Sequence, residues 1–368
     1  MIRSIKQKLQ NNGFDLCHPI NTAWYNKMIQ DEGLIDSGTL KVLPEPSPSI
    51  TAGDENKHCD DGGGGGKRGV QSSYNAILIG NTKTIWSSFL DWLEVRVEEK
   101  ENLQMNDHDK KQAKKDVIAS NPFDTFCEET LSKSLEELCC AEDASGKISS
   151  YELFWSNGKR ERFSMNEAQH GDSQGDTTKS ANAKQSYHCF DNNNNDSFLV
   201  SMQRIASASG EYWHDEENTK LCVHPVYGTW TAFRALVVFE TEQTIISSNI
   251  PSTLPSPCPC PLSQEEMKEA KRVFDYALEM NTCSGQGNNA GSYGTQANKT
   301  WDELCKYLHN QVCQGSSWDK VPESMKPWIE LRNVIRVGRN DWKYDEPQLL
   351  YHYTKDPEIL SIELGKRS

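Results

Sequence analysis

The stretch LCVHPVYGTWTAFRALVVFE, residues 221–240, decides the fold. Its β-branched and aromatic residues flank the segment 225–228, which predicts two strands joined by a tight hairpin connection. In the second strand, every other side chain shares a face. The first face carries Thr229, Thr231, Phe233, Ala235, Val237 and Phe239, and the second carries Trp230, Ala232, Arg234, Leu236 and Val238. Because both faces are largely apolar, we expect this strand to lie deep in a sheet.

Arg234 is the one charged side chain on these two faces. A guanidinium keeps its proton in a protein, and burying it without a partner is costly. The sequence therefore predicts a carboxylate or phosphate partner for Arg234. That partner is either an Asp or Glu of the chain or a bound anionic ligand.

A second arginine, Arg332, lies in the segment KPWIELRNVIRVGR, residues 326–339. Its spacing from Trp328 and Ile335 places it on or beside the buried stripe of a helix. Two interpretations remain open for it. Either its stem covers apolar surface while the charge reaches water, or its guanidinium contacts a ligand.

The periodicity of the remaining segments predicts helices packed on a mainly antiparallel sheet, an α+β fold. Ser263 and Glu266 are spaced as a capping box at the start of a helix. The predicted helices cover residues 2–10, 85–93, 123–139, 264–280, 301–312 and 324–337, and further strands cover 74–80 and 149–155.

Three segments are polar and of low complexity: 44–69, with five consecutive glycines at 62–66, 164–197, and 284–298. Such composition offers little apolar surface to bury, so we expect disordered insertions in loops. The expected single domain then consists of 70–163 and 198–360, with 1–43 as its N-terminal part. In residues 198–213, the small side chains at 206–210 suit a close approach of another element or a flat ligand.

The net charge of −14 argues against nucleic acid as a partner, and we find no apolar run long enough for a membrane. The N-terminal residues lack the apolar core of a secretory signal. Twelve cysteines then indicate free thiols in a reducing cytoplasm. We interpret Cys139–Cys140 and Cys258–Pro259–Cys260 as packed thiols, because no second cluster completes a metal site.

The familiar catalytic motifs are absent from the sequence. His224 is either an acid/base group or metal ligand, or a satisfied structural group at a strand end. Cys222 is better interpreted as a packed thiol than as a nucleophile. Tyr212, Trp213, Tyr227 and Trp230 are either core residues or the wall of a site for a large planar ligand.

Three segments carry a resemblance to a known family: GFDLCHPINTAWYNKM (13–28), CVHPVYGTWTAFRALVV (222–238) and YDEPQLLYHYTKDP (344–357). They resemble the family forms GFEV-P-x(3)-AWYN, C-[IV]-HP-x-[FY]-GGW-[FA]-x-x-R and Y-x-EQ-x(2)-YF-x-T-P-P. That family is the cobalamin-processing proteins of methylmalonic aciduria and homocystinuria type C (CblC). The resemblance covers about 13–95 and 149–357, interrupted by the low-complexity insertions.

This resemblance implies a flavin nitroreductase-like fold that binds cobalamin base-off, with the nucleotide tail displaced from cobalt. It implies a cyanocobalamin reductase, which removes cyanide with electrons from weakly held reduced FMN or FAD. It also implies an alkylcobalamin dealkylase, which transfers the alkyl group to glutathione. The chain has no D-x-H-x-x-G motif, so no histidine of that kind would ligate the cobalt from below, which makes its reduction easier.

Residue by residue, the resemblance assigns Arg234 and Arg332 to glutathione. It assigns Val200, Met202, Gln203, Tyr212, Trp213, Cys222 and Phe233 to cobalamin. Three positions depart from the family: Ser207 stands near a usual histidine, Thr229 replaces the second turn glycine, and Leu360 falls close to a third arginine.

Three other classes of function stay open, namely a non-catalytic cobalamin carrier, a flavin reductase on the same fold, and an acidic interaction scaffold, which rests only on the polar insertions. The resemblance also implies a downstream cobalamin-trafficking partner, and a monomer or a ligand-induced homodimer.

Overall fold

The computed structural model describes residues 2–35, 40–44, 75–102, 107–119, 121–140, 148–156, 159–164, 188–189, 200–241, 254–283, 319 and 321–367. The predicted insertions 44–69 and 164–197 lie outside these residues, apart from 44, 164, 188 and 189. The predicted loop 284–298 and the predicted helix 301–312 lie wholly outside them.

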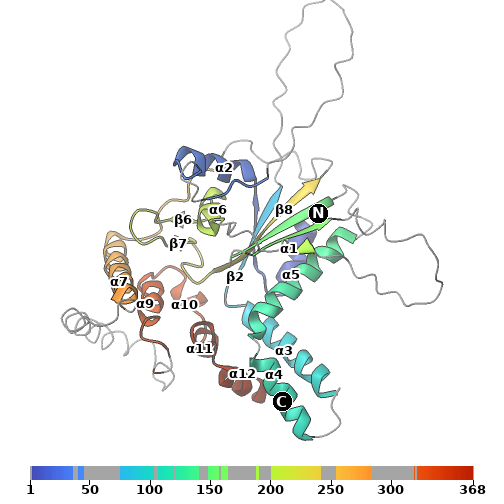
Figure 1. Ribbon diagram of the computed structural model, residues 1–368. Coiled ribbons are helices and arrows are strands. Elements are labelled where there is room, and N and C mark those ends of the chain that lie inside the picture. Colours follow the sequence, from blue (N-terminus) through green and yellow to red (C-terminus); the bar gives the residue numbers. More distant parts are fainter. Residues whose placement is uncertain are drawn as a thin grey trace, which may run out of the picture.

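The described strands form one six-stranded antiparallel sheet in the order β1-β2-β8-β3-β4-β5 (Figure 1). They are β1 (Leu16–Ile20), β2 (Ala76–Asn81), β3 (Ile148–Trp155), β4 (Arg160–Ser164), β5 (His188–Cys189) and β8 (Ala232–Thr241). A separate two-stranded sheet pairs β6 (Trp213–His214) with β7 (Cys222–Val223). The predicted α+β class is confirmed.

Helices cover both faces of the large sheet (Figure 1). On one face lie α1 (Ile2–Asn11), α3 (Ile85–Asn102) and α5 (Pro122–Cys140), and on the other α2 (Thr22–Asp31) and α6 (Met202–Ala208). α4 (Asp107–Ala119) and α12 (Pro357–Gly365) pack against α3, and α7 (Gln264–Cys283) packs against α9 (Lys326–Val334). The short α10 (Arg339–Trp342) and α11 (Glu346–Thr354) connect α9 to α12.

The predicted faces of the strand that contains Arg234 are wrong beyond this residue, because β8 has a β-bulge. Gly80 of β2 pairs with Phe233 and Ile79 pairs with Ala235, so Arg234 is the extra residue. A Cβ on Gly80 would lie 2.7 Å from the carbonyl oxygen of Ala232, which explains the glycine. As a result, Ala235, Val237 and Phe239 share the core cluster of Trp230, whereas Leu236 and Val238 belong to the cluster against which Phe233 packs.

The predicted hairpin within 221–240 is also wrong, since β7 and β8 belong to different sheets. The tight turn itself exists: the His224 and Gly228 backbones exchange hydrogen bonds of 2.9 and 2.8 Å. Gly228 has a φ of +60°, and a Cβ there would collide with the carbonyl oxygen of Val337. The turn is therefore closed against the loop after α9, and β7 pairs with β6 instead.

The predicted capping box is confirmed at the start of α7. The Ser263 hydroxyl accepts a hydrogen bond from the Glu266 N–H at 3.2 Å, and the Glu266 carboxylate accepts one from the Ser263 N–H at 3.1 Å. The same carboxylate accepts a hydrogen bond of 2.9 Å from the Arg336 N–H. Glu266 thus caps α7 and also joins it to the loop that follows α9.

Candidate functional site

Arg234 projects from the bulge of β8 toward the first turn of α5. Its Nε donates a 2.6 Å hydrogen bond to the Asn81 side-chain oxygen, and its guanidinium lies 4.8 Å from the Phe123 ring centroid. Both partners are neutral, so neither of them compensates the positive charge of this half-buried side chain. The bulge is the cause, because it adds one residue and aims the side chain at α5.

Arg332 lies between two aromatic rings, with its guanidinium 4.5 Å from the Trp230 centroid and 4.8 Å from that of Tyr344. Its Nε donates to the Thr229 carbonyl at 3.0 Å, and Nη1 donates to the Tyr353 hydroxyl at 3.4 Å. Its Nη2 is buried without a regular hydrogen bond among the described residues. Arg332 thus does more than cover apolar surface, because it joins α9 to the segment before β8.

Lys355 is a third cation of this region, and the sequence analysis missed it. It ends α11 in a left-handed conformation, and its ammonium lies 5.7 Å from the Phe123 ring centroid and 5.4 Å from that of Tyr351. Burial lowers the pKa of Lys355, Asp124 raises it and the charge of Arg234 lowers it further. One signal for this residue was present in the sequence, because Lys355 follows Thr354 where the family form T-P-P has its first proline.

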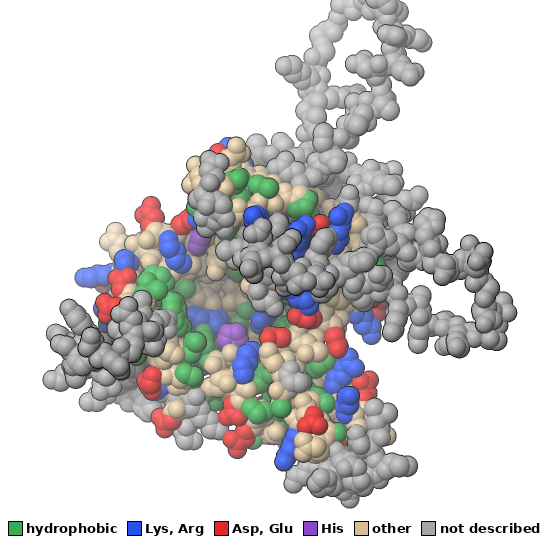
Figure 2. Space-filling view, viewed as in Figure 1, with side chains coloured by type: hydrophobic (Ala, Val, Ile, Leu, Met, Phe, Trp, Pro, Cys, Tyr) green, Lys and Arg blue, Asp and Glu red, His purple; other side chains and the backbone are tan. Residues whose placement is uncertain are grey.

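His352 of α11 is buried beside this region, since its ring contacts those of Tyr344 and Tyr353, which also contact Arg332. Burial first, and then the charges of Arg234, Arg332 and Lys355, hold the pKa of His352 well below its ordinary value. Within the described part of the chain, no carboxylate forms an ion pair with any of the three cations. Figure 2 shows a hollow in the middle of the visible face, with Lys, Arg and His side chains at its edge. Cations that lack a protein counter-ion in this way suit an anionic ligand.

Five of the residues expected to contact cobalamin, Val200, Met202, Tyr212, Cys222 and Phe233, lie in or against the apolar cluster on the opposite face of the sheet, whereas Trp213 packs against the separate cluster formed by β7, α7 and the α9 region. The Phe233 ring centroid lies 5.2 Å from that of Tyr212, and the Cys222 thiol lies 3.9 Å from the Gln203 carbonyl oxygen. Trp213, Cys222 and Phe233 are half-buried and Gln203 is exposed, so these four offer surface to a ligand. Val200, Met202 and Tyr212 are buried, and Tyr212 has no exposed surface. Tyr212 thus supports Phe233 from behind.

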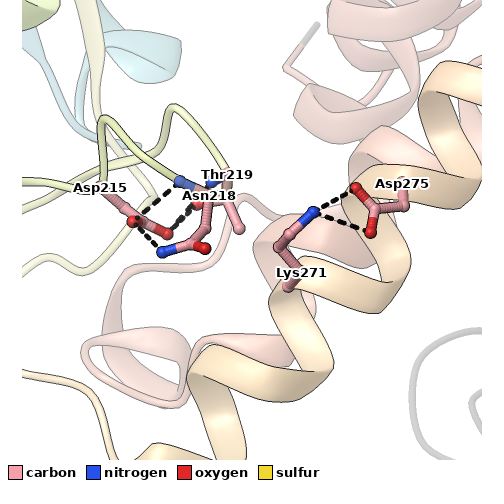
Figure 3. A network of polar contacts seen from close by, with 5 residues as sticks. All are labelled: Asp215, Asn218, Thr219, Lys271 and Asp275. Carbon is pink, nitrogen blue, oxygen red and sulfur yellow. Dashed lines mark hydrogen bonds and ion pairs between the residues drawn. The ribbon is translucent and has the colours of Figure 1, made fainter.

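The loop between β6 and β7, which positions Trp213 and Cys222, is fixed by Asp215 (Figure 3). Its buried carboxylate accepts hydrogen bonds from the Asn218 side chain at 3.0 Å and from the Thr219 hydroxyl at 2.8 Å. The nearby pair Lys271–Asp275 of α7 is an exposed surface ion pair and adds little stability. Asp215 is therefore the group that holds this loop.

His224 has a structural role in the turn. Its Nδ1 accepts hydrogen bonds from the N–H groups of Val226 at 3.0 Å and Tyr227 at 3.3 Å, so this nitrogen is unprotonated. The His224 ring lies 6.3 Å from that of His18, and burial lowers the pKa of both histidines to about 4. Both rings are therefore neutral at pH 7. The geometry favours the structural interpretation of His224 over an acid/base role.

These two histidines make the protein acid-sensitive. In the unfolded chain each titrates near its ordinary value of 6.5, so between pH 6.5 and about 4 the unfolded state binds more protons. The free energy of unfolding should then fall as the pH falls through this window, by on the order of 2–3 kcal/mol for buried His224.

Urea unfolding of the wild type and of His224→Asn between pH 4 and 7 checks this. An asparagine oxygen can accept the same backbone N–H bonds without titrating. The variant should therefore lose less stability on acidification. Parallel pH profiles for the two proteins would show that His224 does not contribute.

The three positions that depart from the family have clear places. Ser207 is half-buried in α6, and the Thr229 hydroxyl donates a 3.2 Å hydrogen bond to the Arg332 carbonyl. Leu360 of α12 is fully buried in the core cluster, so this position does not supply a charged contact to a ligand. The third cation of this chain is therefore Lys355, which stands five residues before Leu360.

The chain thus folds as an α+β protein with a cationic cluster beside β8, and this cluster has no carboxylate ion pair among the described residues. No protein-family model matches the chain, and no curated protein matches it. Among solved structures, it is similar to a crystal structure of the C. elegans B12-trafficking protein CblC, a human MMACHC homologue. The two chains are 14% identical, with a TM-score of 0.48 over 97% of this chain and 93% of that one.

None of the described helices has both the length and the apolar character that crossing a membrane requires. Among the described residues, no three His, Cys, Asp or Glu side chains are arranged to hold a metal ion.

Proposed function

We propose that this protein processes cobalamin inside the cell, removing cyanide reductively and transferring alkyl groups to glutathione. The observation that supports this best is the cluster of Arg234, Arg332 and Lys355, which has no carboxylate partner among the described residues. Residues 222–238, which carry the resemblance to the cobalamin-processing family, supply both Arg234 and the expected cobalamin contacts Cys222 and Phe233.

The cationic cluster would hold glutathione by its two carboxylates. A guanidinium offers parallel N–H donors to a carboxylate, whereas the Lys355 ammonium acts as a point charge. Fixing both ends of the tripeptide limits where its sulfur can lie. The thiolate would then form a bond to the alkyl carbon, while the electron pair of the cobalt–carbon bond stays on cobalt.

The cobalamin would lie against the accessible side chains of Gln203, Trp213, Cys222 and Phe233, with Val200, Met202 and Tyr212 packed behind them. His224 is not proposed as a lower ligand, because its Nδ1 already accepts two backbone N–H bonds. A cobalt without a lower nitrogen donor is easier to reduce, which suits both reactions.

Reduced FMN or FAD would supply the electrons for decyanation as a weakly held, diffusible donor, and we assign no residue to it. Glutathione remains reduced in the cytoplasm, so we place the protein there. A downstream cobalamin-trafficking protein would receive the product.

An absorbance titration with methylcobalamin in the dark tests the proposal. We expect a shift to the base-off spectrum on binding, then loss of the methyl group and formation of S-methylglutathione once glutathione is added. A base-off shift without methyl loss would indicate a carrier. A protein that is yellow with bound FMN and gives no shift would indicate a flavin reductase.

A further inference from the structure

Asn81, at the end of β2, is a fully buried polar side chain that is bonded at both ends of its amide. Its nitrogen donates a 2.8 Å hydrogen bond to the Thr82 carbonyl oxygen, and its oxygen accepts the 2.6 Å bond from Arg234 Nε. Asp15 in turn accepts a 2.8 Å bond from the Thr82 N–H, which fixes this residue. Because one neighbour needs a donor and the other an acceptor, only one orientation of the Asn81 amide satisfies both.

The bond from Asn81 decides which part of Arg234 is left for a ligand. A guanidinium carries five N–H donors, and Asn81 takes the one on Nε. Among the described residues, neither Nη1 nor Nη2 of Arg234 donates a hydrogen bond, and the side chain is only half-buried. These two nitrogens form the end of the planar fork, which donates in parallel to the two oxygens of a carboxylate.

The second group that holds Arg234 is Phe123, which is 5% exposed. Its ring centroid lies 4.8 Å from the Arg234 guanidinium and 5.7 Å from the Lys355 ammonium, so one ring contacts two cations. An amide oxygen and an aromatic ring attract a cation without cancelling its charge. A carboxylate at position 81 would also hold Arg234, but it would compensate the charge that a bound anion needs.

We propose that Asn81 is a positioning residue of the anion site, whose neutral oxygen fixes the Arg234 guanidinium and leaves its Nη1 and Nη2 edge and its full charge for a carboxylate of the ligand. This inference rests on the proposed function. It adds that the site binds its ligand end-on through Arg234, and that the neutrality of residue 81 is required for this binding.

Isothermal titration calorimetry of the full chain with S-methylglutathione tests the proposal, because this probe keeps both carboxylates of glutathione and lacks the reactive thiol. Asn81→Ala removes the acceptor of Nε, so the guanidinium is no longer held, and the Kd should rise by roughly tenfold. Asn81→Asp keeps the acceptor but places a negative charge beside the ligand carboxylate, and the Kd should rise by at least roughly tenfold.

A double-mutant cycle separates positioning from a merely structural role. In an Arg234→Gln background, Asn81→Ala should weaken binding no further, because Asn81 acts on the ligand only through Arg234. The matched control is Asn26→Ala. Asn26 is also buried, and its side chain exchanges two 2.8 Å hydrogen bonds with the Leu43 backbone. This control should lose stability in a melting curve and keep the wild-type Kd.

The outcomes distinguish the two levels of the proposal. If the wild type does not bind S-methylglutathione, the anion site is wrong, and the role of Asn81 fails with it. If the wild type binds, additive effects of Asn81→Ala and Arg234→Gln, or a wild-type Kd for Asn81→Ala, would overturn positioning and leave the anion site standing. A wild-type Kd for Asn81→Asp would overturn the need for a neutral group. Asn81→Ser, whose shorter side chain leaves Nε without its acceptor, replaces Asn81→Ala if that variant does not fold.

Discussion

Replacing Trp230 by alanine should unfold the protein or leave it aggregated at 25 °C. Trp230 has no exposed surface and is among the largest side chains that are fully buried. Its ring packs edge-on against Tyr344 at 5.6 Å, beneath the Arg332 guanidinium at 4.5 Å. Truncating a buried tryptophan costs about 3–5 kcal/mol, which is a large share of the 5–15 kcal/mol that stabilises an ordinary domain.

The loss extends beyond the cavity itself. The Arg332 guanidinium lies between the Trp230 and Tyr344 rings, so without Trp230 it would stack on Tyr344 alone. The contact between α9 and the start of β8 would then be weaker. Urea unfolding measures the effect where the variant can be purified. Trp92→Ala is the matched control, because Trp92 of α3 is only partly buried and should cost less.

Arg234→Gln serves as the second comparison. Its described partners are one amide oxygen and one ring face, so the folded state without ligand should lose about 1.5–3 kcal/mol, less than Trp230→Ala. A free energy of unfolding for Trp230→Ala within 1 kcal/mol of the wild type would show that the core relaxes around the cavity. A large loss for Arg234→Gln would instead indicate a structural role for this arginine.

Local sequence patterns predicted the elements whose determinants are close in the chain. Ser263 and Glu266 stand three residues apart, and both capping hydrogen bonds form within that turn. Most of the predicted helices and strands within the described residues exist, with ends mostly shifted by a few residues, although the helix predicted over 85–93 continues to Asn102. Helix and strand periodicities need only a short window, because the side chains that define each face are near one another in sequence.

Features that depend on distant residues were missed. The partner of β7 is β6 and not β8, because the turn at Gly228 is closed against the loop at Val337. The bulge that redirects Arg234 is set by register with β2, more than 150 residues away, as the Arg234–Asn81 separation of 153 shows. Lys355 was missed for the same reason, since only the folded chain brings the end of α11 to Phe123.

Replacing either arginine should impair demethylation of methylcobalamin far more than decyanation of cyanocobalamin. If Arg234 and Arg332 hold glutathione carboxylates, each substitution by glutamine removes a charged hydrogen bond, which is worth about 1.5–3 kcal/mol. Glutathione use should then fall by roughly 10- to 150-fold. Lys355→Gln should show the same pattern with a smaller loss, because an ammonium lacks the paired donors of a guanidinium.

The two reactions differ in what they demand of geometry. Attack on the alkyl carbon requires the sulfur in line with the cobalt–carbon bond, and anchored carboxylates supply that alignment. Decyanation needs an electron, which a loosely held donor can deliver. Activity with reduced flavin should therefore stay near the wild-type value in Arg234→Gln, provided that cobalamin still binds.

The measurement compares methyl loss with glutathione against cyanide loss with reduced flavin, in variants whose base-off spectrum has first been verified. Arg272→Gln is the matched control, because Arg272 is an exposed arginine of α7 paired with Glu269, and both activities should survive its loss. Arg332→Gln also requires a melting curve, since Arg332 joins α9 to Thr229. Equal loss of both activities in Arg234→Gln would contradict carboxylate anchoring, and unchanged demethylation would remove Arg234 from the site.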